Sequence, residues 1–333
     1  MIDVALLLNR GDVQKLLNIE DAIDVVEAAF SELASGTATM PDRTVIIDPD
    51  VGGWIASMPA YLKSSGALGA KSVTVYKGNP DKFGLPTTLA SIILLDQNTG
   101  QTVAVMDGGY LTAIRTGAVS GVATRHLARK DASVGAILGA GVQARAQVLA
   151  MCASANLEKV VIFAMDPPES VQAFADGLAE ATGVTMEVAS STAGALSDAD
   201  VVALATTAAE PIVDGAWFKP GAHINAIGSH APGVRELDTA TLLRAKVVCD
   251  TKVACLNEAG DIQIPIEAGE YSADQIHGDL GDVVNGTIAG RESDDEITLF
   301  KSVGLAIQDI SCAALVYKKA KEAGAGTEFD FSR

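Results

Sequence analysis

The feature that most constrains the fold is a glycine-rich turn between a short apolar segment and a helical one. Val134–Leu138 predicts a buried strand, Gly139-Ala140-Gly141-Val142-Gln143-Ala144 follows it directly, and residues 142–155 have a helical pattern. In a Rossmann domain the first glycine permits the tight turn, the second lets a pyrophosphate approach the backbone, and a small residue lets the helix pack on the sheet. A turn of the same shape without a ligand is the alternative, but its position between strand and helix favours a dinucleotide site.

Strands and helices alternate along the chain after this turn. A helical pattern spans residues 171–181, and apolar segments that predict strands recur on both sides of it. These segments are 160–165, 185–188, 201–205, 223–227 and 247–250. Such alternation is typical of a parallel, doubly wound sheet with helices on both faces. The sequence therefore predicts an α/β fold that contains a Rossmann domain.

The first third of the chain has a different pattern. Apolar residues at helical spacing predict an amphipathic helix over Ile19–Ala34. Four segments then predict strands with little helix between them, which is typical of an antiparallel or mixed sheet. These segments are 44–47, 70–76, 90–95 and 102–106. An alanine-rich helix follows up to Arg129, and residues 297–320 predict one long helix outside the parallel sheet.

Two polar positions follow strands of the predicted parallel sheet. Asp166 ends the second strand, near the distance of about 20 residues at which a ribose-binding acid is expected. A carboxylate there accepts hydrogen bonds from the ribose 2′-hydroxyl and repels a 2′-phosphate, which favours NAD over NADP; a solvated loop acid is the alternative. Thr206 ends a later strand at the carboxyl edge, where ligands bind in such folds, although a turn-forming hydroxyl explains it nearly as well.

The composition argues against two classes of partner. The formal net charge is −18, and a surface of that sign repels nucleic-acid phosphates and anionic lipid headgroups. No segment approaches the roughly 20 apolar residues that cross a bilayer, and the amino terminus lacks a signal-peptide pattern, so a cytoplasmic location is expected. The four cysteines lack metal-ligand spacing, and no metal site is predicted.

Seven segments, in the same order, resemble the ornithine cyclodeaminase/μ-crystallin family over nearly the whole chain. They are Met40-Pro41-Asp42-Arg43, Gly69-Ala70-Lys71, Gly84-Leu85-Pro86-Thr87, Leu111-Thr112-Ala113-Ile114-Arg115-Thr116-Gly117-Ala118, the Gly139 turn, Gly228-Ser229-His230-Ala231-Pro232-Gly233 with Arg235-Glu236-Leu237, and Phe300-Lys301-Ser302-Val303-Gly304. The resemblance implies a Rossmann dinucleotide-binding domain, residues 119–302, inserted into a mixed α/β substrate-binding and dimerisation domain, residues 1–118 plus 303–333. It also implies a homodimer.

The resemblance further implies roles for three cationic residues. Arg43 and Lys71 would bind a substrate carboxylate, and Arg115 would lie between the substrate and a cofactor phosphate. Physical chemistry agrees, because an acidic protein that binds an anionic substrate needs local cations, and arginine offers a two-pronged fork. A surface salt bridge is the alternative for each. The predicted cofactor contacts are Thr87, Arg115, Thr116, Gly139, Gly141, Val142, Gln143, Asp166, Thr206, Gly228 and Ser302, and Val303 is predicted at the substrate.

One position departs from the family pattern. Cyclodeaminases of this family carry an aspartate where this sequence has His230. An imidazole can donate or accept a proton near neutral pH, but it supplies no fixed anion to hold an ammonium group. Members without the aspartate resemble imine reductases, so His230 and Lys71 are candidate proton donors, with water as a third. A loop histidine without a proton role is the alternative.

The sequence therefore predicts an NAD(P)H-dependent reductase of an α-imino acid, which is a ketimine or iminium next to a carboxylate. The product would be an L-amino acid, formed by hydride transfer from nicotinamide, and the partners would be this small anionic substrate and a second copy of the chain. NAD is expected in preference to NADP. Two alternatives stay open: ornithine cyclodeamination to proline and ammonia, and a non-catalytic ligand-binding protein similar to μ-crystallin.

Overall fold

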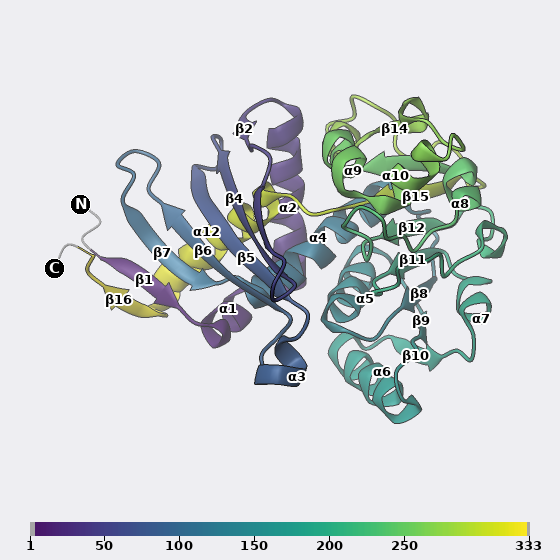
Figure 1. The fold of residues 1–333 in the computed structure, drawn as a ribbon, viewed down its shortest axis with the longest axis horizontal. Helices are drawn as coiled ribbons and strands as arrows, with labels where there is room; N and C mark the ends of the chain where they lie inside the picture. Colours follow the sequence, from purple (N-terminus) through teal and green to yellow (C-terminus); the bar gives the residue numbers. More distant parts are fainter. Residues whose placement is uncertain (1–3, 332–333) are drawn as a thin grey trace. The chain divides into compact units, whose positions relative to one another are not determined.

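The computed structural model describes residues 4–331, which form two compact units. The first unit contains the chain up to Arg115 and again from Leu305, and the second contains Thr116–Gly304. The second unit is therefore an insertion into the first (Figure 1). Helix α4 (Gly109–Leu127) begins in the first unit and ends in the second.

The first unit is built on an eight-stranded mixed sheet. The strand order is β16-β1-β7-β6-β5-β4-β2, with β3 paired to β4 outside this path. The strands are β1 (Ala5–Leu8), β2 (Ala38–Thr39), β3 (Thr44–Asp48), β4 (Gly53–Leu62), β5 (Ala67–Tyr76), β6 (Thr88–Leu95), β7 (Thr102–Asp107) and β16 (Thr327–Phe329). Strands β1 and β7 are parallel, and the other neighbours are antiparallel.

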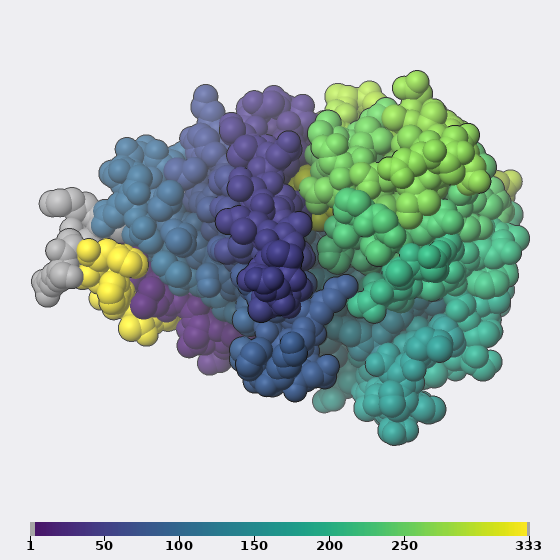
Figure 2. Space-filling model, viewed as in Figure 1, coloured from purple at the N-terminus to yellow at the C-terminus, as the bar shows by residue number. Residues whose placement is uncertain are grey.

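One face of this sheet is covered by helix and the other carries exposed apolar residues. Helix α12 (Ala306–Ala323) packs on β4, β5 and β6 and beside α2 (Ile19–Ala34), and the short helices are α1 (Arg10–Leu16) and α3 (Asn79–Phe83). Burial alternates along β4 and β6, as expected for strands with one buried face. The exposed apolar side chains are Val45, Ile46, Ile47, Ile55, Leu89 and Ile93. Figure 2 shows the dark blue segment around β3 at the surface of this unit.

The second unit is built on an eight-stranded parallel sheet. The strand order is β10-β9-β8-β11-β12-β15-β13-β14, and every neighbouring pair is parallel. The strands are β8 (Val134–Leu138), β9 (Lys159–Phe163), β10 (Thr185–Val188), β11 (Val201–Leu204), β12 (His223–Ala226), β13 (Ala245–Cys249), β14 (Ile276–Asp279) and β15 (Ile297–Lys301). The strand order reverses between β8 and β11, which is the topological switch point where Rossmann folds bind dinucleotides.

Helices connect these strands and bury the sheet from both sides. They are α5 (Val142–Ser154), α6 (Pro168–Thr182), α7 (Thr192–Leu196), α8 (Thr239–Arg244), α9 (Lys252–Glu258), α10 (Gly260–Glu267) and α11 (Leu280–Val284). Two separate apolar clusters lie on the sheet, one that includes Val148, Val160 and Leu178, and one that includes Val202, Ile224 and Leu299. The predicted α/β fold with a parallel Rossmann sheet is confirmed.

Two sequence predictions were wrong in detail. Residues 297–320 do not form one helix, because Ile297–Lys301 is the fully buried strand β15 inside the parallel sheet, and α12 begins only at Ala306. Gly304 lies between them with a φ of +83°, where a helix cannot continue, and a short apolar run does not distinguish a buried strand from a helix. Strand β9 ends at Phe163, so Asp166 lies in the loop after it.

Candidate active site

In the first unit, one buried carboxylate joins two of the predicted cations. The Nζ atom of Lys71 lies 2.7 Å from Oδ2 of Asp309, and Nε of Arg115 donates to Oδ1 of the same carboxylate at 3.0 Å. Nη1 of Arg115 donates to Oε1 of Gln308 at 2.5 Å. Lys71 is 1% exposed, and Asp309 and Gln308 are fully buried. The two cations therefore have fixed positions.

Local sequence explains how this cluster forms. Lys71 shares the buried face of β5 with Ala67, Gly69 and Val73, because alternate residues of a strand face the same side. A side chain at Gly69 would meet Ile310 of α12 at 3.3 Å and the Ile93 carbonyl at 2.3 Å, so glycine lets the helix approach. Asp309 lies in the first turn of α12, where a carboxylate also interacts well with the helix dipole.

The surroundings of Lys71 bring the pKa of its ammonium group close to neutral pH. Burial lowers its pKa from 10.5 to about 7, and the neighbouring Arg115 and Arg43 guanidinium groups act in the same direction, whereas Asp309 raises it. Arg43, which is partly exposed just before β3, thus faces the same cluster. The structure brings together the three cations that were predicted to bind substrate. It adds Asp309, which the sequence analysis missed.

In the second unit, the glycine turn has the geometry of a phosphate cradle. Gly139 has a φ of +114°, and a Cβ there would lie 2.7 Å from the carbonyl oxygen of Ala205, so another residue would not fit. A Cβ on Gly141 would meet nothing within 4 Å, and Gly141 caps α5 without a side-chain hydrogen bond. The free N–H groups at this helix start therefore suit a pyrophosphate.

Several other predicted cofactor residues lie around this turn or further along the same sheet edge. Val142 is exposed, Oε1 of Gln143 is buried without a hydrogen-bond partner, and Asp166 is exposed. Thr206 follows β11, and Gly228 follows β12, so both lie at the carboxyl ends of strands. In the first unit, the carbonyl of Thr87 accepts a hydrogen bond from the Tyr76 N–H. Thr116, the first residue of the second unit, is buried in α4. The residues of the second unit fit a dinucleotide at the switch point.

Buried acids hold the loops at this edge. Glu236 accepts hydrogen bonds from the Thr206 N–H at 2.8 Å and hydroxyl at 2.6 Å, and burial raises its pKa. Asp261 accepts from the backbone N–H groups of residues 236 and 237, and its other oxygen lies 2.7 Å from Nζ of Lys301. Lys301 also donates to the carbonyls of residues 226 and 229. These contacts connect the ends of three strands.

Asp250 does the same for the segment with Ser302, a predicted cofactor contact, and Val303, which was predicted at the substrate. Its Oδ2 accepts from the Ser302 hydroxyl and from the N–H groups of Val303 and Gly304, at 2.8–2.9 Å. His230, in contrast, is exposed, and its Nδ1 lies 3.0 Å from the carbonyl oxygen of Gly228. Glu236, Asp250 and Asp261 were not predicted as site-supporting residues. Glu236 lies inside the motif Arg235-Glu236-Leu237, which carries part of the family resemblance.

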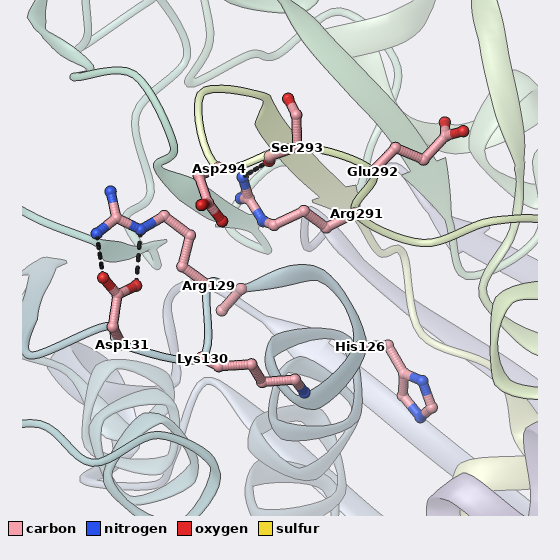
Figure 3. Close-up of a pocket in the computed structure, with 9 residues that line it drawn as sticks. His126, Arg129, Lys130, Asp131, Arg291, Glu292, Ser293 and Asp294 are labelled. Atoms are coloured by element: carbon pink, nitrogen blue, oxygen red, sulfur yellow. Dashed lines mark hydrogen bonds and ion pairs between the residues drawn. The ribbon is translucent and has the colours of Figure 1, made fainter.

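A separate pocket of about 370 Å³ lies in the second unit (Figure 3). Arg129 forms a bidentate pair with Asp131, and Lys130 donates to the carbonyl of Arg125. Arg291 donates to backbone carbonyls, including that of Ala222, which precedes β12. The pocket is therefore at the amino edge of the sheet and contains none of the predicted site residues. Among residues 4–331, no helix could span a membrane and no acid, histidine and cysteine cluster suits a metal.

Comparison with known proteins gives consistent results over the full length. The sequence model of the Ornithine cyclodeaminase/mu-crystallin family matches residues 3–324. Delta(1)-pyrroline-2-carboxylate reductase of Thermococcus litoralis, solved with NADH and L-proline, is 46% identical with a TM-score of 0.93, over 97% of this chain and 99% of that chain. An archaeal alanine dehydrogenase dimer with bound NAD is 36% identical with a TM-score of 0.92, over 98% and 99%. Delta(1)-pyrroline-2-carboxylate reductase of Bacillus cereus is 39% identical over 98% of this chain and its own full length.

Proposed function

The chain belongs to the ornithine cyclodeaminase/mu-crystallin family, and from that premise we propose that it is an NADH-dependent reductase of α-imino acids. The product is an L-amino acid. The observation that carries this proposal is the buried cluster of Lys71, Arg115 and Asp309, faced by Arg43, in a chain 46% identical to a reductase of a cyclic imino acid. A buried lysine whose pKa lies near 7 beside two guanidinium groups is typical of a functional site, which favours a catalytic role over a non-catalytic one.

The substrate carboxylate is bound by the cations of the first unit. Arg43 and Arg115 are guanidinium groups, which hold a carboxylate by two parallel hydrogen bonds. Their local positive charge overcomes the repulsion that the net charge of −18 exerts on an anion. Oriented binding of this kind is the main catalytic contribution of the chain, because the cofactor, when bound, supplies the hydride.

The cofactor is held by the second unit, whose glycine turn and uncapped α5 fit a pyrophosphate. Asp166 accepts hydrogen bonds from the ribose hydroxyl, which favours NAD over NADP. The segments that Glu236 and Asp250 hold, with Thr206, Gly228, Ser302 and Val303, form the nicotinamide side. The solved relatives with bound NADH or NAD support this assignment.

The first unit also forms a homodimer. The outer face of its sheet exposes Ile46 at 65%, Ile47 at 71% and Ile93 at 44%, which is unfavourable in water unless another surface covers them. The archaeal alanine dehydrogenase, itself a dimer, supports a symmetric pairing of two copies. Light scattering should therefore give about twice the 34.2 kDa of one chain.

The activity is tested by following NADH and NADPH oxidation with a panel of imino acids. The panel contains Δ1-pyrroline-2-carboxylate and mixtures of 2-oxo acids with ammonia or methylamine, and L-ornithine is offered separately with NAD. We expect NADH oxidation with at least one imino acid and a higher kcat/KM for NADH than for NADPH. Faster conversion of L-ornithine to proline and ammonia, or no NADH oxidation with any imino acid, would contradict the proposal.

A further inference from the structure

Asp309 occupies an unusual position for an acid in a site that binds anions. Its side chain is fully buried, and each of its two oxygens contacts a different cation, Lys71 through Oδ2 and Arg115 through Oδ1. A buried carboxylate beside the cations competes with the substrate carboxylate for the same charges. Such a cost calls for a function that the cations alone do not fulfil.

We propose that Asp309 is a positioning residue that reserves the Lys71 ammonium as proton donor to the imine nitrogen, so that Arg43 and Arg115 bind the substrate carboxylate. This inference rests on the proposed function and assigns its proton donor. The sequence had left the donor open among Lys71, His230 and water. The geometry favours Lys71, because His230 is exposed whereas Lys71 is buried among the cations that hold the substrate.

The contacts of Asp309 fix directions as well as charge. With Oδ2 2.7 Å from Nζ, the carboxylate forms an ion pair with the ammonium group and fixes the position of its nitrogen. Its other oxygen and Gln308 hold Nε and Nη1 of Arg115, so the plane of that guanidinium is set before any substrate binds. Both residues lie in the first turn of α12, which packs on the strand that carries Lys71. The three charged groups thus form a rigid set.

The charges that face Lys71 explain why the carboxylate is needed. Burial and the guanidinium groups of Arg115 and Arg43 all favour the neutral amine, and Asp309 is the group that opposes them. The balance leaves the pKa of Lys71 at about 7, where a general acid works best at neutral pH. Cys312, one turn further along α12, stays a neutral thiol, because burial raises its pKa to about 12.

The proton step balances without another reactant. A proton leaves Nζ of Lys71 and forms the new N–H bond on the imine, which becomes an iminium ion. The iminium carbon accepts the hydride from bound NADH, and a C–H bond forms as NAD⁺ is produced. The Lys71 amine then takes a proton from water. The net reaction consumes one NADH and one proton for each amino acid formed.

The test compares Asp309→Asn with Asp21→Asn. Asparagine keeps the size and one acceptor of Asp309 but removes the charge that sustains the Lys71 ammonium. Asp21 is the matched control, because its carboxylate pairs with Lys319 on the same helix α12, outside the cluster. For reduction of Δ1-pyrroline-2-carboxylate, kcat/KM of the unmodified protein should fall on the alkaline side with an apparent pKa of about 7. In Asp309→Asn this alkaline limb should lie at a pH lower by about one unit or more. At pH 8, kcat/KM should therefore fall by about tenfold.

Four further measurements separate this role from a general loss of structure. Asp21→Asn should leave the profile unchanged, and NADH affinity should stay within about threefold in Asp309→Asn. Lys71→Gln, in which Arg115 still pairs with Asp309, should abolish the alkaline limb even if Asp309→Asn does not fold. His230→Ala should keep the limb and lose less than about tenfold in kcat. An unshifted limb in Asp309→Asn, or a retained limb in Lys71→Gln, would overturn the inference.

Direct titration distinguishes this inference from the proposed function. In protein labelled with ¹³C-lysine, the Lys71 signal, assigned by its absence from Lys71→Gln, should titrate near pH 7 and shift to lower pH in Asp309→Asn. If the Lys71 signal behaves in this way but no imino acid is reduced, the proposed function is disproved, while the effect of Asp309 on the pKa of Lys71 is retained. Imine reduction with no shift of the Lys71 signal would disprove the inference alone.

Discussion

Gly228→Ala should damage the second unit by displacing a carboxylate that glycine alone accommodates. A Cβ at this position would lie 2.4 Å from both carboxylate oxygens of Glu236, about 1 Å inside ordinary contact. Gly228 does not have a positive φ, so the backbone itself would accept alanine. The whole effect therefore comes from Glu236, which is fully buried.

The magnitude follows from the bonds that Glu236 must give up. Its Oε1 accepts from the N–H and the hydroxyl of Thr206, at 2.8 and 2.6 Å. Displacing the carboxylate by about 1 Å breaks both, and hydrogen bonds to a charged group contribute about 1.5–3 kcal/mol each. Because both bonds end on the same oxygen atom, their contributions do not simply add, and we expect Gly228→Ala to cost about 2–4 kcal/mol. NADH affinity should fall with it if Thr206 and Gly228 lie on the nicotinamide side, as proposed above.

A double-mutant cycle tests this reasoning. The free energy of unfolding is measured in urea by circular dichroism, and NADH binding by fluorescence, for Gly228→Ala, Glu236→Ala and the double variant. In the Glu236→Ala background the glycine substitution should cost less than about 0.5 kcal/mol. Gly177→Ala in α6 is the control, because a Cβ there meets only Arg145 at 3.7 Å and alanine favours the helix. Additive costs of the two substitutions would refute the proposed contact.

Three further outcomes follow from charged groups in the second unit. Lys301→Met should lower the free energy of unfolding, measured in urea, by about 3–5 kcal/mol, because Asp261 is left buried without its cation. The double variant Lys301→Met with Asp261→Asn should recover part of this loss, and a double variant as unstable as Lys301→Met, or less stable, would contradict the prediction. Asp166→Ala should shift the ratio of kcat/KM for NADH over NADPH towards NADPH by about 10–100-fold, and an unchanged ratio would show that Asp166 does not face the 2′ position. Burial lowers the pKa of His223 to about 3, below the unfolded value near 6.5, so its contribution to stability is complete above pH 6.5 and is lost as pH falls. His223→Gln should unfold with a weaker pH dependence between pH 6.5 and 4 than the unmodified protein, as measured by the melting temperature, and identical slopes would disprove the assignment.

Local patterns predicted the elements whose sequences are periodic or bounded by turns. Helix α2 was predicted at Ile19–Ala34 as it is found, and strand β8 with its glycine turn was predicted within one residue. The same patterns failed for Ile297–Lys301, because five buried residues in a row have no period, and only the neighbouring strands β12 and β13 decide that they form a strand. Strand β4 was missed, since Gly53, Pro59 and Ala60 give it little β propensity. Its register with β3 and β5 supplies what propensity lacks.

Most of the predicted site residues lie within motifs that are contiguous in the chain, and Asp166 and Thr206 follow segments that were predicted to be strands. The acid that holds Lys71 and Arg115 does neither. Asp309 lies on a helix whose neighbouring residues Ile307 and Ile310 only predict packing, and Lys71, its partner, is far away in the sequence. Nothing local indicates that a charged residue in that helix faces a lysine. The partner of a buried charge is therefore a property of the fold and cannot be found from spacing.

The same point changes the meaning of the acidic composition. A net charge of −18 suggests that acids serve solubility, and most of them are indeed exposed. Three acids, however, have no exposed surface, and each contacts a segment of a predicted binding motif. Asp309 contacts Lys71 and Arg115, Asp261 contacts Lys301, and Asp250 accepts hydrogen bonds from the backbone of residues 303 and 304. Because a buried charge is retained only where its partners repay the loss of hydration, these three acids report where the chain requires fixed geometry. Fixed geometry matters most where residues that bind substrate and cofactor must keep their positions to within a fraction of an ångström. The buried acids therefore give a stronger reason to assign function to these places than the motifs alone provide.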